Sequence, residues 1–439
     1  MPRPGKPASA CPGLLRIVQA RDGGICRVKL PGGALSSVQA RAIAEVAREC
    51  ASGVLELTNR SNLQIRGVRT DQHDALIERL LAAQLGPRNS DADDVRNLLL
   101  SPAAGLDPLA LLDTRPLASE LLDLLQNTPA LHALSAKFAI QLDGGEALAM
   151  LEHPHDIWLS AVHAQPTRLA FGLAGCPGDM PLGTITVEQA PRLIEHVLGL
   201  FLETAGTEHS RMRQLLADTP VSQWLESLRV RLPFALQPPP ANWQRTAGPR
   251  RPIGRYPQRQ AGLCMVVAGA VLGRIDAMQL SALASLAERH GDASVRLTPW
   301  QGVLLPNIPT AAADSALHAL QTLGLLVRPN DPLNGMIACA GAVACNKGLA
   351  DSKADALHLA RRLAASGIRP QVHLSACSRS CAAAHVAPFT LLASTPDHYQ
   401  LYQRAPGVAG FGLLRASALD IDQAGDWFAA HCATGDSDA

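Results

Sequence analysis

The strongest constraint on the fold is an internal repeat. Residues 24–68 and residues 262–305 each read as a strand, a helix and a further strand. The match needs no sliding gaps, so we predict two duplicated αβ modules; the alternative is a chance likeness between two unrelated αβ units. Identical residues recur at one fixed separation between the copies: Gln39 and Gln279, Leu57 and Leu297, and Thr58 and Thr298.

Each copy carries the signals of an amphipathic helix packed on a sheet. Ser36 or Ser37 in the first copy and Asp276 in the second are residue types that begin helices. The apolar residues that follow are spaced as one helix face, so we assign them to the core. In the flanking strands, Arg and other polar residues alternate with apolar ones. One face of the predicted sheet is therefore polar and available to a polar ligand.

Composition excludes several classes of partner. The chain has 439 residues, of which 47% are hydrophobic and 18% charged, which is enough for two or three packed domains. Its formal charge is only +1, so no chain-wide field favours nucleic acid or an anionic membrane. No apolar run reaches the roughly 18 residues that cross a bilayer, and the first residues lack a signal-like apolar core. We expect a soluble, cytoplasmic protein.

Changes in pattern divide the chain into five parts. Three consecutive prolines from Pro238 mark a linker ahead of the second copy. A region rich in clustered cysteines follows that copy. The predicted parts are a half-domain at 11–88, an α+β domain at 89–236, the linker at 237–260, a second half-domain at 261–330 and a cysteine-bearing domain at 331–433.

Four of the ten cysteines form two pairs. Cys339 and Cys345 have five residues between them in CAGAVAC, and Cys377 and Cys381 have three between them in CSRSC, with 31 residues between the pairs. A helix near 352–365 and a strand at 371–374 would return the chain close to its start. Zinc sites favour narrower pairs, whereas a cubane cluster accepts varied spacing. We therefore predict that these thiolates hold a 4Fe–4S cluster; zinc is the alternative.

At this point the chain resembles a known family, the sulfite and nitrite reductases that couple sirohaem to a 4Fe–4S cluster. The resemblance implies an α+β fold with two duplicated ferredoxin-like half-domains and two further α/β domains of the sirohaem/4Fe–4S type, related by a pseudo-two-fold axis. The segments that carry it, besides the cysteine pattern, are CPGLLRIVQARDGGICRVKLPGG, GVLELTNRSNLQIRGV, DDVRNLLLSP, AKFAIQLDGG and VHLSAC.

Two departures from the reductases direct the choice of branch. Glu56 reverses a charge where the reductases resemble one another in an Arg, and Ala139 replaces the second lysine of a Lys-Phe-Lys pair. Reduction of a small anion needs concentrated positive charge, so both changes weaken that chemistry. We therefore expect a member of the precorrin-3B synthases. The alternatives are a sirohaem-dependent, ferredoxin-type sulfite or nitrite reductase and a non-enzymatic cluster or zinc protein that reports redox state.

Membership of the precorrin-3B synthases implies a monooxygenase-type oxidoreductase of aerobic cobalamin biosynthesis. It would convert precorrin-3A to precorrin-3B with dioxygen, by hydroxylation with lactone formation. The tetrapyrrole substrate carries carboxylates that basic side chains must pair. Electrons would come from an external donor, ferredoxin or an NADH-linked reductase, because no dinucleotide motif follows a strand. The substrate-binding residues assigned by motif matching are Arg27, Arg60, Arg66, Arg96, Lys137 and Arg296.

The same resemblance implies a mononuclear non-haem iron, whereas sirohaem belongs only to the reductase alternative. Such iron sites use two His and a carboxylate, and the sequence does not single out which ones. No catalytic residue is assigned. The candidates for iron ligands are Glu152, His153, His155, Asp156, His163, His373 and His385.

Overall fold

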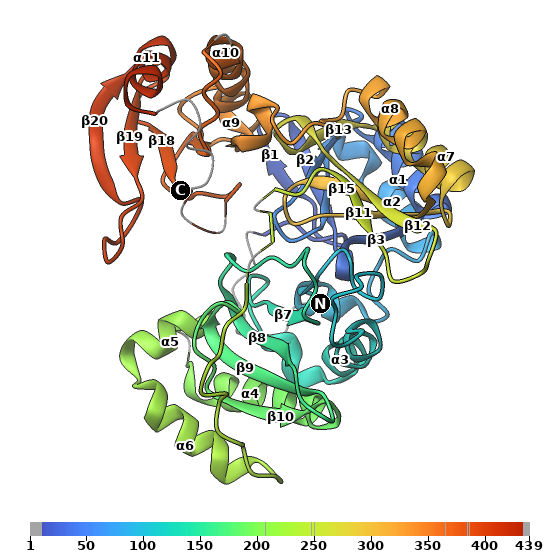
Figure 1. The fold of residues 1–439 in the computed structure, drawn as a ribbon, viewed down its shortest axis with the longest axis vertical. Helices are drawn as coiled ribbons and strands as arrows, with labels where there is room; N and C mark the ends of the chain where they lie inside the picture. The colour runs from blue at the N-terminus through green and yellow to red at the C-terminus, as the bar shows by residue number, and fades with distance from the viewer. Residues whose placement is uncertain are drawn as a thin grey trace.

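The structure is a computed structural model that describes residues 11–206, 208–246, 248–249, 251–364, 366–383, 385 and 387–432. Figure 1 shows three lobes: the two half-domains together, a middle domain coloured green, and a carboxyl-terminal domain coloured orange to red. Each half-domain, the middle domain and the carboxyl-terminal domain contains one five-stranded sheet. The expected α+β fold with duplicated half-domains is thereby confirmed.

The two half-domains exchange a strand, which fixes them to one another. The first sheet has the order β1-β2-β5-β4-β13 and the second the order β11-β12-β15-β14-β3, so β3 and β13 each complete the sheet of the other copy. The strands of the first copy are β1 (Val18–Ala20), β2 (Gly23–Val28), β3 (Ala34–Ser36), β4 (Val54–Leu57) and β5 (Leu63–Val68). Those of the second are β11 (Gly254–Pro257), β12 (Leu263–Gly269), β13 (Arg274–Asp276), β14 (Ser294–Leu297) and β15 (Gly302–Pro309).

Helix capping explains part of the sequence repeat. Ser36 and Asp276 each accept a hydrogen bond from the backbone of the glutamine three residues on, and that glutamine's side chain reaches back to the cap residue. The matched Gln39 and Gln279 therefore close equivalent capping boxes. One apolar core runs through both half-domains. The helices that cover it are α1 (Ser37–Cys50), α2 (His73–Ala82), α7 (Ala277–His290) and α8 (Ala313–Thr322).

The middle domain packs helices on a mixed sheet of order β10-β9-β8-β7-β6. Strands β6, β7 and β8 run parallel to one another. β9 pairs antiparallel with β8, and β10 pairs antiparallel with β9. Its strands are β6 (Leu98–Leu100), β7 (Ile140–Asp143), β8 (His155–Val162), β9 (Arg168–Gly175) and β10 (Gly183–Thr186). Its helices are α3 (Arg115–Asn127), α4 (Ala190–Thr204), α5 (Met212–Asp218) and α6 (Val221–Arg231).

The carboxyl-terminal domain repeats that topology with the order β16-β17-β18-β19-β20. Again three parallel strands are followed by two antiparallel ones. Its strands are β16 (Met336–Ala338), β17 (Val372–Ser375), β18 (Phe389–Ala393), β19 (Tyr399–Gln403) and β20 (Leu413–Leu419). Its helices are α9 (Gly341–Ala344), α10 (Ser352–Ala364) and α11 (Ile421–His431).

One prediction about chain organisation needs correction. The segment 237–260 was expected to be a linker throughout, but its last part forms β11, which pairs with β12. Pro257 is compatible with this strand because β11 lies at the edge of the sheet, where a missing N–H costs no ladder bond. Among the described residues, the helices are all too short or too polar to traverse a lipid bilayer.

Candidate functional site

The parallel pairing of β16 and β17 brings the two cysteine pairs together. Cys339 follows β16 and Cys345 follows α9, whereas Cys377 and Cys381 follow β17. Because carboxyl ends of parallel strands meet at one sheet edge, both loops lie on the same side. The Ala376 N–H donates to Cys339 Sγ at 3.2 Å. The predicted convergence of the two loops is therefore present.

The environment of these thiols suits an iron–sulfur cluster. Desolvation by the surrounding protein and the proximity of the other three thiols raise the pKa of Cys381, although its side chain retains solvent access. Gly341, with a φ of 70°, shapes the first loop; a Cβ there would lie 3.1 Å from the Ala350 carbonyl oxygen. Four soft thiolates with an N–H directed at sulfur form a donor set that fits a 4Fe–4S cluster. No three His, Cys, Asp or Glu side chains of the described ranges are grouped to hold a single metal ion.

Two arginines near the cysteine loops lack a close carboxylate partner among the described residues. Arg27 on β2 donates to the Gln64 amide oxygen at 2.6 Å and lies within electrostatic range of Cys381. Arg60, in the β4–β5 turn, donates to the Lys137 carbonyl oxygen at 3.2 Å. In the part of the chain that is described, neither guanidinium has a carboxylate oxygen within 4.0 Å. Such cations are held for a ligand more readily than for stability.

The pKa of Arg60 reflects this crowding of positive charge. Desolvation and the nearby Arg211 guanidinium lower it to about 10, so Arg60 remains protonated at neutral pH. Desolvation likewise lowers the pKa of Arg27. Lys137, whose carbonyl accepts from Arg60, is itself exposed at the edge of this site. Arg27 thus lies near the exposed cysteine, Arg60 lies near Arg27, and Lys137 adjoins Arg60, so an acidic ligand would be attracted to this group.

The other three predicted basic residues have partners within the protein. The guanidinium of Arg66 binds both carboxylate oxygens of Asp22, at 2.8 and 2.7 Å. Arg96 donates to the carbonyls of Gly86 and Leu85 and pairs with Asp93. Arg296 donates to the carbonyls of Pro102 and Ala104. Because all three side chains are buried in these contacts, they are not included in the proposed ligand site.

Arg211 is a site residue that the sequence did not reveal. It precedes α5, and its Nε lies 2.9 Å from both carboxylate oxygens of Asp156. Asp156 also accepts from the backbone N–H groups of Met212 and Ala139. This carboxylate, a predicted iron-ligand candidate, therefore holds α5 against the start of β7 and leaves Arg211 facing Arg60. Nothing in the local sequence signals the pair, because its partners are 55 residues apart.

The remaining iron-ligand candidates do not form a metal site. The His153 and His385 rings pack with centroids 5.0 Å apart, and His385 Nε2 lies 3.8 Å from a Glu152 oxygen. These three residues line a cavity of about 30 Å³, which has room for water but not for a macrocycle. His155 bonds the His153 carbonyl, His373 is buried on β17, and His163 is exposed.

Two of these histidines make stability sensitive to acid. Desolvation lowers the pKa of His155 and of His373 to about 3, well below the unfolded value near 6.5. The unfolded chain therefore binds protons first, so the free energy of unfolding falls as pH drops below about 6.5 and continues to fall toward pH 3. At pH 5 each histidine is expected to cost about 2 kcal/mol.

Urea unfolding at pH 7 and pH 5 measures this effect. We expect the free energy of unfolding of His373→Gln to fall by about 2 kcal/mol less than that of the parent between pH 7 and pH 5. His163→Gln, at an exposed position, serves as the control and should keep the parent pH dependence. An unchanged pH dependence in His373→Gln would contradict the assignment.

Comparison with known proteins places these features in one family. The nitrite/sulfite reductase ferredoxin-like half-domain matches residues 18–83 and 256–323, and the nitrite and sulphite reductase 4Fe–4S domain matches residues 91–236. The chloroplastic ferredoxin–nitrite reductase of Zea mays is 30% identical over 394 residues, covering 82% of this chain and 68% of the relative. That of Synechococcus elongatus is 28% identical over 403 residues, covering 84% and 76%.

A sulfite reductase and a solved structure are also similar to this chain. The ferredoxin-type sulfite reductase of Mycobacterium tuberculosis is 25% identical over 390 residues, covering 82% of this chain and 68% of the relative. The solved structure of the Mycobacterium tuberculosis NirA protein superposes with a TM-score of 0.79 at 22% identity and covers 94% of this chain and 82% of that one. At that identity the structural match supports the fold alone.

These matches contradict the expected assignment to the precorrin-3B synthases. The relatives are named as ferredoxin-dependent nitrite and sulfite reductases, which agrees with the alternative. The oxidoreductase class and the iron–sulfur expectation agree with the matched families. The predicted monooxygenase reaction in cobalamin biosynthesis is wrong. The dioxygen, tetrapyrrole substrate and mononuclear iron that went with it have no support.

Proposed function

Because the chain belongs to the nitrite and sulfite reductase family, we propose that it is a ferredoxin-dependent reductase of a small oxyanion, nitrite or sulfite, with a 4Fe–4S cluster and sirohaem. The observation that carries the proposal is the exposed Cys381 with Arg27 within electrostatic range of it and Arg60 within range of Arg27. Among the described residues, neither cation has a carboxylate oxygen within 4.0 Å. The names of the relatives supply the donor and the two candidate anions.

The proposed site has two groups of residues: four cysteines that hold the cluster and arginines that bind negative groups. In this proposal, the cluster ligands are Cys339, Cys345, Cys377 and Cys381, as their convergence suggests. When bound, the cluster supplies single electrons and sirohaem supplies the iron at which the anion is reduced. Both sirohaem, through its acid side chains, and an oxyanion are negatively charged, so the uncompensated guanidinium groups fit either.

The basic residues have separate roles in orientation and proton supply. Arg27 and Arg60 bind and orient negative groups in a partly desolvated site, where each charge-assisted hydrogen bond is worth about 1.5–3 kcal/mol. Lys137, exposed at the edge, carries an ammonium proton toward the anion. Arg211 is fixed by Asp156 and contributes positive potential without leaving its ion pair. Ala139 supplies no charge, so the arginines carry more of the anion binding than a two-lysine site would require.

Absorption and turnover of the purified protein test the proposal. We expect Soret and red bands of sirohaem above a broad iron–sulfur shoulder, with oxidation of reduced ferredoxin on addition of nitrite, of sulfite or of both. The rates with each anion identify the substrate, and a reaction without anion is the control. A brown shoulder without sirohaem bands and without turnover of either anion would overturn the proposal, as would a colourless zinc protein.

A further inference from the structure

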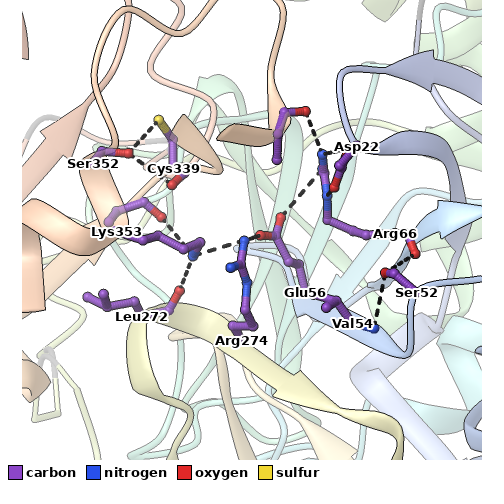
Figure 2. A network of polar contacts seen from close by, with 12 residues as sticks. Asp22, Ser52, Val54, Glu56, Arg66, Leu272, Arg274, Cys339, Ser352 and Lys353 are labelled. Atoms are coloured by element: carbon purple, nitrogen blue, oxygen red, sulfur yellow. Dashed lines mark hydrogen bonds and ion pairs between the residues drawn. The ribbon is translucent and has the colours of Figure 1, made fainter. Parts of the chain in front are cut away.

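A buried polar network connects the first half-domain to the cysteine-bearing domain (Figure 2). At its centre is Glu56 on β4, with a side chain 13% exposed. Its carboxylate pairs with three cations from three different elements. They are Arg66 on β5 at 3.7 Å, Arg274 on β13 at 2.8 Å and Lys353 on α10 at 3.9 Å.

Two of these cations also hold backbone at the cysteines. Lys353 Nζ donates to the carbonyl oxygen of Ala338, the residue before Cys339, at 3.4 Å, and to that of Leu272 at 2.5 Å. Arg66 Nη2 donates to the carbonyl oxygen of Ala344, the residue before Cys345, at 2.9 Å. The carbonyl preceding each member of the first cysteine pair is therefore held by a cation that also pairs with Glu56.

The buried cations of this network depend on the Glu56 carboxylate to balance their charge. Although desolvation opposes it, Lys353, Arg66 and Arg274 hold the pKa of Glu56 below its usual range. Arg66 has a second carboxylate in Asp22, but Lys353 has only Glu56 within 4.0 Å among the described residues. Loss of one partner of a buried ion pair leaves an uncompensated charge, which costs several kcal/mol unless the structure relaxes. Relaxation here would move α10 and the chain before Cys339.

We propose that Glu56 is a positioning residue for the first cysteine pair. Acting through two buried cations, it fixes the backbone before each cysteine and contributes a negative charge to the field at the cluster. The inference rests on the proposed cluster ligands and goes beyond the proposed function, because Glu56 touches neither anion nor cysteine. It also explains why a carboxylate stands at this position: it faces the network of Figure 2 rather than a ligand.

Two variants with opposite changes of charge distinguish a specific effect of Glu56 on the cluster from a general loss of stability. Glu56→Gln removes a negative charge, which favours the more negative reduced cluster and should raise its midpoint potential. Lys353→Met removes a positive charge and should lower it. We also expect amide hydrogen exchange to rise about tenfold or more within residues 336–346 in both variants, while residues 371–379 stay closer to the parent.

The experiment uses the full chain as purified, with its cluster, and potentiometric titration followed by electron paramagnetic resonance. Asp143→Asn is the matched control, because Asp143 on β7 of the middle domain is a buried carboxylate that pairs with Arg245 of the 237–260 segment. It should lower overall stability without changing the potential or the exchange of 336–346. Shifts of the potential in the same direction for both variants, or exchange that rises throughout the chain as in the control, would overturn the proposal.

A double variant tests the pairing even if one of the single variants fails to fold. If either single variant does not accumulate, Glu56→Gln with Lys353→Met should recover soluble protein and a potential near that of the parent, since it restores charge balance. A double variant no better than the singles would argue against the pairing. Iron and sulfide analysis of the parent separates the hypotheses: a parent without a cluster defeats the proposed function, whereas a parent with one and unaffected variants defeats this inference alone.

Discussion

Replacing Cys377 by serine is expected to abolish nearly all iron and acid-labile sulfide in the purified protein. A hydroxyl is a hard and weakly acidic ligand, so a site built from four thiolates loses one corner of its cluster. Because cluster binding contributes to folding of the surrounding loops, the soluble yield should fall as well. Cys339→Ser should have the same effect, although its sulfur additionally accepts the Ala376 N–H.

Iron and sulfide content per chain, with the visible spectrum, measure this loss. Cys176→Ser is a suitable control: Cys176 is half-buried, and its sulfur lies 3.6 Å from a carboxylate oxygen of Asp179 in the middle domain. The control should keep the parent iron content and colour. Full iron and sulfide in Cys377→Ser or Cys339→Ser would show that the cluster has other ligands.

The cysteine site was predictable because its signals are local. Spacing within CAGAVAC and CSRSC, and a helix and strand between them, required only short-range patterns. In the structure that helix is α10 and that strand is β17. The parallel pairing of β17 with β16 places both cysteine loops at the same edge of the sheet. Liganding by these four cysteines nevertheless stays a prediction until the cluster is measured.

The fold was predictable in outline for the same reason, but its long-range pairings were not. The repeat identified two αβ modules, yet the exchange of β3 and β13 depends on three-residue strands whose partners lie in the other copy. Such short strands carry too little periodicity to indicate where they pair. β11 was hidden similarly, because an edge strand that ends in proline reads as linker.

The error about function came from Glu56 and Ala139, and for Glu56 the surroundings could not be seen in the sequence. Glu56 was interpreted as a reversed charge toward an anionic ligand, which argued against a reductase. The structure shows the carboxylate among Lys353, Arg66 and Arg274 instead. A charge on a strand has two possible faces and many possible neighbours, and only the tertiary structure determines which it meets. The same applies to Arg211, whose partner Asp156 is remote in sequence.

Arg60→Ala is expected to weaken ligand binding by roughly ten- to a hundredfold, with no loss of the cluster. The estimate follows from the loss of one charge-assisted hydrogen bond worth about 1.5–3 kcal/mol. Arg60→Lys keeps the charge but not the planar pair of donors, so its effect should be smaller. Stability offers an independent measure: Arg60 is desolvated without a carboxylate partner in the described chain, so its removal should leave the melting temperature unchanged or raise it.

Sirohaem content per chain and KM for nitrite and sulfite, with a chemically reduced donor, identify what Arg60 binds. If Arg60 binds the macrocycle, Arg60→Ala has less sirohaem per chain and an unchanged turnover per sirohaem. If Arg60 binds the anion, the sirohaem content is full and the KM for the anion is raised. Arg168→Ala is the matched control, because Arg168 is also half-buried and, within the described part of the chain, donates only to a backbone carbonyl, that of Thr184. If Arg60→Ala instead lowers the melting temperature and leaves sirohaem content and both KM values at those of Arg168→Ala, Arg60 is a structural residue and the anionic ligand lies elsewhere.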